Sequence, residues 1–218
     1  AILYRTNAQS RAIEESLRKM NIPYRIFGGL SFYQRKEVKD LIAYIRLAIN
    51  PKDEESFKRI INYPTRGLGK TTQEKILVLA NQLGVSAWDV IRNKEALVTQ
   101  FNAGVINKLD AFSSMVGSFS AELTSADAYD LATRIATSSG ILNELYSDRT
   151  PEGVSRYENI QELLNAIKDF AEQEPEEGEV VEEGSKTLSA FCADIALLTD
   201  ADQKKGADDI ERVSLMTV

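Results

Sequence analysis

The sequence predicts a mainly α-helical protein in which a helical domain is inserted into a small α/β stub built from both ends of the chain. Short apolar runs at residues 1–4, 24–27 and 213–218 have the length and composition of strands. Between residues 28 and 208, apolar residues recur mostly at helical spacing. A hydrophobic content of 43% and a charged content of 27% are typical of a globular protein that buries a sizeable core.

The first 27 residues predict a strand, a helix and a second strand. The helix, over about residues 8–20, places Ile13, Leu17 and Met20 on one face. Two strands joined by such a helix form a βαβ unit in which the strands run parallel. Two strands do not make a stable sheet, so the last strand can pair with them and return the chain to the same sheet. Because no initiator Met precedes the first strand, we expect a piece of a longer protein.

The middle of the chain begins at Gly28-Gly29, where the strand pattern breaks, and is predicted to be nearly all helical. Helical periodicity covers residues 38–49, 57–61, 76–83, 88–91, 106–123, 131–135, 160–170 and 188–198. Residues 172–183 hold seven glutamates and no Lys or Arg, which predicts a solvated loop and not a metal site. Residues 200–209 predict a polar loop.

Composition excludes several classes of site. The absence of histidine excludes His-containing metal clusters and Ser-His-Asp catalytic triads. The single cysteine, Cys192, cannot form an internal disulfide, and it fits a reducing, cytoplasmic compartment. No apolar run approaches the roughly 18 residues that a membrane-spanning helix needs, so no membrane partner is expected.

Charge is distributed unevenly along the chain. Residues 1–75 carry 15 Lys and Arg against 8 Asp and Glu, whereas residues 76–218 carry 11 against 25. A basic first third joined to an acidic remainder indicates one surface that binds a polyanion and another that is kept away from it.

The turn at residues 62–72 carries the clearest binding signal. Pro64 ends one helical run, Gly67-Leu68-Gly69 makes the turn, and a second helical run follows. The two glycines let the backbone approach a partner closely, and the N–H groups that open the second helix favour an anion. The flanking residues that add charge or hydroxyl donors are Thr65, Arg66, Lys70, Thr71 and Thr72. Such a helix-hairpin-helix holds nucleic-acid phosphates without reading sequence. The alternative is a plain turn between two helices with exposed basic residues.

Four stretches, in the same order, resemble the UvrD/PcrA/Rep group of superfamily 1 helicases. They are residues 2–11; Ile22-Pro23-Tyr24 with Gly28-Gly29, Phe32, Arg35, Glu37, Lys39 and Asp40; Asn62, Pro64 and Arg66-Gly67-Leu68-Gly69; and residues 213–218. The resemblance is specific over residues 1–75 and at the last strand, whereas between them only helix order and length are similar. Leu68 stands where that family commonly has Ile, a change that the packing of the turn should tolerate.

The resemblance implies a fold and a function. Residues 1–27 and 209–218 would belong to a RecA-like motor domain, called 2A, and residues 28–208 would form an inserted helical accessory domain, called 2B. The longer protein would be an ATP-dependent helicase that moves 3′ to 5′ on single-stranded DNA, with ATP and Mg²⁺ as its cofactors and none bound by this piece. The implied partners are DNA at a junction of single strand and duplex, the remaining helicase domains, and repair or replication proteins.

The resemblance also implies three groups of site residues. Tyr4, Arg5, Asn7 and Arg11 would contact single-stranded DNA. Thr65, Arg66, Gly67, Leu68, Gly69, Lys70, Thr71 and Thr72 would bind duplex DNA ahead of the fork. Gly28, Gly29, Arg35, Glu37, Lys39 and Asp40 would form the junction of 2A and 2B, with rotation about the paired glycines. The plainer interpretations are a core position for Tyr4, cap or surface positions for Asn7 and Arg11, and a solvated helical turn for residues 35–40.

No catalytic residue and no metal ligand is predicted. The Gly69-Lys70-Thr71 sequence echoes a phosphate-binding P-loop, but Pro64 stands where that motif needs its first glycine, and the segment joins two helices. This piece is therefore not expected to hydrolyse ATP. Two alternatives stay open: an acidic regulatory or docking module with little DNA affinity, and the equivalent part of a helicase–nuclease.

Overall fold

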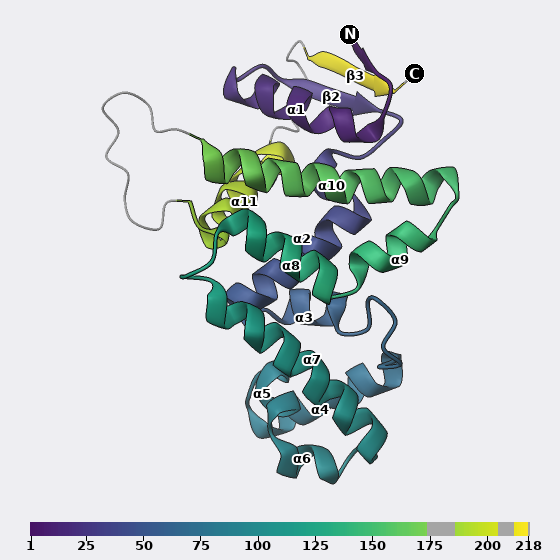
Figure 1. Ribbon diagram of the computed structural model, residues 1–218, viewed down its shortest axis with the longest axis vertical. Helices are drawn as coiled ribbons and strands as arrows, with labels where there is room; N and C mark the ends of the chain where they lie inside the picture. Colours follow the sequence, from purple (N-terminus) through teal and green to yellow (C-terminus); the bar gives the residue numbers. More distant parts are fainter. Residues whose placement is uncertain (174–185, 205–211, 218) are drawn as a thin grey trace.

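A small parallel sheet joins the two ends of the chain. The computed structural model describes residues 1–173, 186–204 and 212–217, without the side chains of Asn7 and residues 197–204 (Figure 1). Strands β1 (Ile2–Tyr4), β2 (Tyr24–Phe27) and β3 (Val213–Thr217) lie in the order β1-β3-β2, and both neighbouring pairs are parallel. The prediction that the last strand returns to the sheet of the first two is confirmed, and this strand takes the central position between them.

One face of the sheet is covered by α1 (Ser10–Lys19), which follows the short η1 (Asn7–Gln9). Tyr4, Leu17 and Leu215 form a small buried core between the helix and the strands. On the opposite face, Leu3 and Phe27 both pair in register with Met216, and they are 61% and 44% exposed. We call β1, α1, β2 and β3 the sheet unit.

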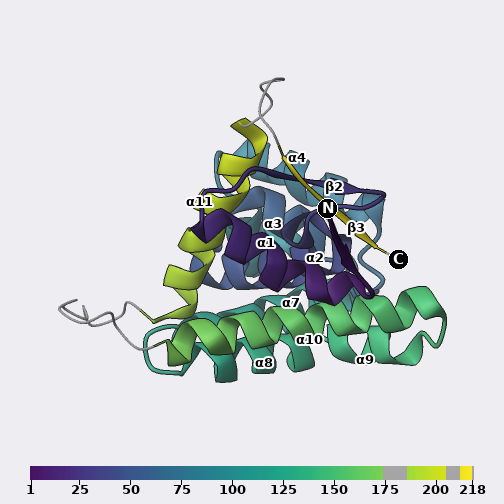
Figure 2. The ribbon, with the colours of Figure 1, turned by 90° about the horizontal axis from the view of Figure 1, so that it is seen from above.

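The remaining helices share one large core and form what we call the helical unit. They are η2 (Phe32–Gln34), α2 (Lys36–Ile49), α3 (Glu54–Ile60), α4 (Lys70–Leu83), α5 (Ala87–Arg92), α6 (Lys94–Val98), α7 (Ala103–Glu122), α8 (Ala128–Ser138), α9 (Ile141–Ser147), α10 (Pro151–Glu172) and α11 (Leu188–Lys204). In Figure 1, α10 lies directly below the sheet unit, while α4 and α6 lie at the far end of the molecule. Seen from above in Figure 2, α10 and α11 flank α2.

Helix α2 is the centre of the helical unit. Ten of its residues are buried, from Glu37 to Ala48, and they point in every direction around the helix axis. A helix that is buried on nearly all sides has to be surrounded by other helices. The helix ends where the predicted periodicity over residues 38–49 ends, with Asn50 as its C-cap.

The structure corrects three expectations about the later helices. The short α6 and α9 were not expected, and α11 continues to Lys204, beyond the point where the polar loop was placed. Ser86 caps α5 and forms a capping box with Asp89. Most of the acidic segment at residues 172–183 lies outside the described residues. Within the described ranges, no helix is long and apolar enough to cross a membrane.

Cys192 on α11 is expected to resist alkylation in the folded protein. Its thiol is buried, and burial raises its pKa to about 12. Because the thiolate is the reactive form, its reaction with iodoacetamide at pH 8 should be slower than that of an unfolded control by at least about a hundredfold. The rate should rise with pH, because the thiolate fraction rises. Equal rates for folded and unfolded protein would contradict the buried position.

Candidate nucleic-acid interface

The turn between α3 and α4 is built on the side chain of Asn62. Its Oδ1 accepts hydrogen bonds from the N–H groups of Arg66 (3.0 Å) and Leu68 (2.9 Å). Leu68 is fully buried and fixes the turn to the helical core. Gly67 has φ +72, a backbone conformation that favours glycine, and a Cβ there would lie 2.5 Å from Nζ of Lys108 on α7. The turn is therefore rigid on its inner side.

The outer side of the turn is open. Within the part of the chain that the structure describes, the N–H groups of Gly69, Lys70 and Thr71 have no hydrogen-bond partner. These groups open the 14-residue helix α4, where the helix dipole favours an anion. A Cβ at Gly69 would meet no atom within 4 Å, and the Lys70 side chain is 90% exposed. The opening of α4 thus presents three donors and an ammonium group to solvent.

The three predicted threonines lie around this opening. Thr65 and Thr71 are exposed, whereas Thr72 is half-buried and its N–H donates to the carbonyl of Gly69. The two exposed hydroxyl groups can therefore add to the donors of the turn.

Arg66 points into the protein instead of outward. Its guanidinium donates to the carbonyl oxygens of Ile60, Pro64 and Ser139 and to the hydroxyl of Tyr44. It also lies over the rings of Tyr44 and Phe112, at 5.6 and 5.5 Å from their centroids. Arg66 was predicted as a duplex contact, but in the structure its side chain connects the turn to α2, α7 and α8.

The predicted single-strand group is divided between core and surface. Tyr4 is buried in the sheet core, and burial raises the pKa of its hydroxyl. Arg5 is exposed and lines a cavity of about 260 Å³ with Thr6 and Thr217, at the carboxyl ends of β1 and β3. Ligands of open parallel sheets bind at that edge. The side chain of Asn7 lies outside the described residues.

Arg11 is buried in ion pairs across the two units. Its guanidinium contacts Glu15 of its own helix at 2.8 Å, and Glu162 and Asp169 of α10 at 2.7 and 3.2 Å. In this arrangement all three nitrogens face carboxylates of the same chain. Arg11 was predicted as a single-strand contact, but the structure places it between α1 and α10.

The predicted junction residues meet a second polar network there. Arg35 donates to Oδ1 of Asn159 (2.8 Å) and to the Ser10 hydroxyl (2.7 Å), and Nδ2 of Asn159 donates to Glu37 (2.6 Å). These residues come from α1, α10 and the start of α2 and are all buried. Together with Arg11, Glu162 and Asp169 they form what we call the polar junction.

The four other predicted junction positions are not part of this network. Gly28 has φ +76 and, like Gly29, is exposed, so the connection from β2 to η2 is unobstructed. Asp40 is buried and pairs with Arg59 at 2.7 Å inside the helical unit, where burial raises the pKa of its carboxyl. Lys39 is exposed. The structure therefore brings Arg35 and Glu37 together but not Lys39 and Asp40.

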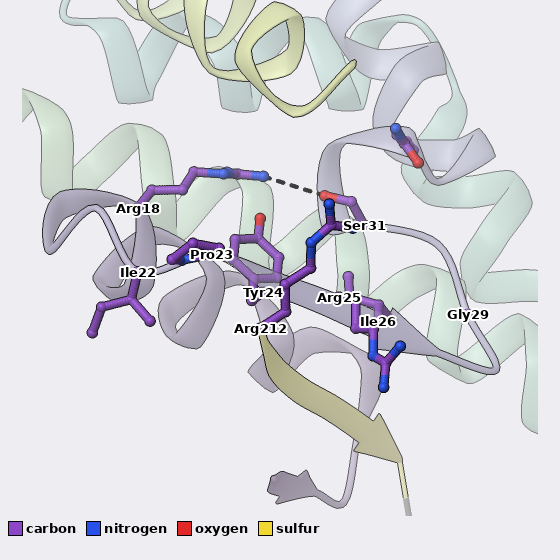
Figure 3. Close-up of a pocket in the computed structure, with 10 residues that line it drawn as sticks. Arg18, Ile22, Pro23, Tyr24, Arg25, Ile26, Gly29, Ser31 and Arg212 are labelled. Atoms are coloured by element: carbon purple, nitrogen blue, oxygen red, sulfur yellow. Dashed lines mark hydrogen bonds between the residues drawn. The ribbon is translucent and has the colours of Figure 1, made fainter. Parts of the chain in front are cut away.

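A pocket at the opposite edge of the sheet was not anticipated from the sequence. The pocket has a volume of about 240 Å³, and Arg18, Arg25 and Arg212 are among its lining residues. Figure 3 shows these residues near the amino ends of β2 and β3. Arg18 donates to the Ser31 hydroxyl at 3.3 Å, the contact drawn as a dashed line. Arg18 lies on α1 and Arg25 on β2, and the pairing of β2 with β3 brings Arg212 beside them from the other end of the chain.

The Gly69-Lys70-Thr71 sequence does not have the structural setting of a P-loop. The Gly69-Lys70-Thr71 sequence lies between two helices, whereas a P-loop follows a strand. Among the residues that the structure describes, no group of three or more Asp, Glu, Cys or His side chains could hold a metal ion.

Comparison with known proteins identifies the family. A family model described as the UvrD-like helicase C-terminal domain matches residues 1–218. The chain is 39% identical over 222 residues to "ATP-dependent DNA helicase PcrA" of Bacillus subtilis, and 37% and 36% identical to the proteins of the same name in Staphylococcus aureus and Leuconostoc citreum. Each match covers all of this chain but only 28–29% of the relative. The chain therefore belongs to the UvrD-like helicase C-terminal domain family.

Proposed function

We propose that this chain is the part of an ATP-dependent DNA helicase that holds duplex DNA by its phosphates at the turn between α3 and α4. The observation that carries the proposal is the open start of α4, with three N–H donors and Lys70 facing solvent above a buried Leu68. Backbone donors at a helix start bind phosphate without reading bases. A grip of this kind suits a protein that has to act on any sequence.

In the proposed division, residues 28–208 form the inserted accessory domain 2B, and residues 1–27 and 209–218 belong to the motor domain 2A. Two separate hydrophobic cores support this division. Arg5 and Asn7 would contact single-stranded DNA at the carboxyl edge of the sheet, with Tyr4 supporting the edge from the core. Translocation from 3′ to 5′, ATP with Mg²⁺, and repair or replication partners would belong to the longer protein, whose relatives are named ATP-dependent helicases.

A second candidate function is a docking or regulatory module. Residues 76–218 carry 11 Lys and Arg against 25 Asp and Glu, a balance that disfavours DNA over most of the helical unit. The two functions are compatible if the helical unit rotates about Gly28-Gly29 relative to the sheet unit. The polar junction supports such motion, because hydrogen-bonded and ionic contacts exchange with water more readily than an apolar core does.

The test is binding of the 218-residue chain to a labelled duplex with a 3′ single-stranded tail across a salt series. Log affinity should fall linearly with log salt, with a slope of roughly −0.9 per phosphate neutralised. Gly69→Ala should leave the thermal melt unchanged, because its φ of −64 and the empty space around it accept a methyl group. It should still weaken duplex binding by about tenfold, equal to about 1.4 kcal/mol, because the methyl group keeps a phosphate away from the donors.

Two glycine variants control this result. Gly67→Ala should weaken binding and also lower stability by about 1 kcal/mol, because its φ is positive. Gly117→Ala, on an exposed face inside α7, should change neither binding nor fold. A folded wild-type chain without salt-dependent binding would contradict the DNA proposal and favour the docking module.

A further inference from the structure

We propose that Lys36 and Lys108 extend the turn into a basic strip, defined by Lys36, Lys70 and Lys108, along which one DNA backbone lies. The inference deepens the proposed duplex grip and rests on it. The three lysines come from the starts of α2 and α4 and from α7, so no local sequence pattern connects them. All three are exposed.

Lys108 lies against the turn itself. Its Nζ stands 2.5 Å from the position that a Cβ at Gly67 would occupy, and both residues are exposed, so the ammonium group lies beside the turn and in contact with solvent. The missing side chain at Gly67 thus leaves room for a cation as well as permitting a positive φ. A phosphate at the start of α4 would meet this ammonium group beside the backbone donors.

Lys36 lies on the side of the turn where α3 ends. Its Nζ is 5.3 Å from the ring centroid of Tyr63, which comes four residues before Gly67 in the chain. A cation–π contact of this kind holds a lysine over a ring while its ammonium group stays solvated. Arg59 donates to the carbonyl of Lys36 at 3.2 Å, which fixes the backbone that carries it.

Acidic groups set the limits of the strip. Glu74 lies 3.9 Å from Lys70, one helical turn further along α4. Glu144 of α9, with Asp40 and Glu37, is near enough to Tyr63 to help raise the pKa of its hydroxyl, although burial is the largest cause. A phosphate chain would therefore avoid α9 and follow the three lysines. The lysines before, beside and after the turn would then contact successive phosphates.

The test compares glutamine variants, which keep most of the length of the side chain and remove its charge. Lys36→Gln and Lys108→Gln should each weaken duplex binding about three- to tenfold and reduce the salt slope by about 0.9. The losses should be the same on two unrelated duplex sequences, because phosphates carry no sequence information. Lys94→Gln on α6 removes the same charge outside the strip and should leave the salt slope unchanged.

A double-variant cycle distinguishes a local role of Lys108 beside Gly67 from a general effect of removing one positive charge. A methyl group at Gly67 has to displace Lys108, so Lys108→Gln should weaken binding less in the Gly67→Ala background than in the wild type. If Gly69→Ala weakens binding while Lys36→Gln and Lys108→Gln behave like Lys94→Gln, the proposed basic strip is wrong. The proposal that the turn between α3 and α4 binds duplex phosphates would still hold. If the wild-type chain does not bind duplex at all, both are wrong.

Discussion

Replacing Arg66 by alanine is expected to destabilise the protein by about 3 kcal/mol or more, although the residue stands in the predicted DNA-binding turn. The guanidinium donates to three carbonyl oxygens and one hydroxyl, and its removal leaves these partly buried acceptors without their donor. For a chain of this size, a loss of about 3 kcal/mol lowers Tm by roughly 6–12 °C. Thermal unfolding followed by circular dichroism measures it.

Two further variants define the role of Arg66. Arg66→Lys should recover only a small part of the stability, because an ammonium group cannot reproduce a planar fork with several donors. Lys70→Ala, four residues later and fully on the surface, should leave Tm unchanged. An Arg66→Ala protein with wild-type Tm and no DNA affinity would mean that the guanidinium faces DNA, contrary to the structure.

Replacing Glu14 by alanine is expected to cost about 3 kcal/mol and to loosen the sheet unit first. Glu14 is 1% exposed and accepts hydrogen bonds from the Phe32 N–H (3.1 Å), the Tyr24 hydroxyl (3.3 Å) and the Ser31 hydroxyl. It also pairs with the guanidinium of Arg18 at 3.4 Å. Removing one member of a buried ionic network leaves the others poorly solvated, which costs about 3–5 kcal/mol.

Hydrogen exchange locates this effect. The two cores are separate, so amides of β3 and of Phe32 should lose protection while those of α7 and α8 keep it. Glu95→Ala, an exposed position on α6, should change neither region. Uniform loss of protection across α7 and α8 would show that the two units unfold together.

Local periodicity was sufficient to predict the long helices and the three strands. Helices α2, α7 and α10 each carry several buried residues at helical spacing, and the spacing shows in the sequence. Helix α6 buries one residue, Leu97, and α9 buries two, Ile141 and Leu145, so neither shows a clear helical period in the sequence. The central position of β3 depends on pairing with residues 189 positions away in β2 and 213 positions away in β1, and such pairing leaves no local signal.

The same limit applies to the candidate site. The glycines and the buried Leu68 could be identified from their order, because a turn between two helices restricts which residues fit. The direction in which a long side chain points could not be predicted from the sequence. Arg66 finds its acceptor at Ser139, and Arg11 finds its carboxylates at Glu162 and Asp169. Positive charge in the motifs predicted Arg66 and Arg11 as DNA contacts, whereas tertiary packing places both side chains in contacts within the protein.

Helix α2 connects the polar junction to the turn between α3 and α4. The helix begins next to Arg35 at the polar junction. Eight residues later, the Tyr44 hydroxyl accepts a hydrogen bond from Arg66 and donates one to the carbonyl of Tyr63 at 2.6 Å, and these bonds hold the turn between α3 and α4. With 14 residues, the helix is about 21 Å long. Tyr44 lies eight residues, or about 12 Å, beyond Lys36, so a tilt of about 10° at the junction would move the turn that it holds by about 2 Å. That displacement is more than half of the ~3.4 Å rise between neighbouring phosphates of one DNA strand, so small angular steps at the junction would change which phosphate the turn can reach.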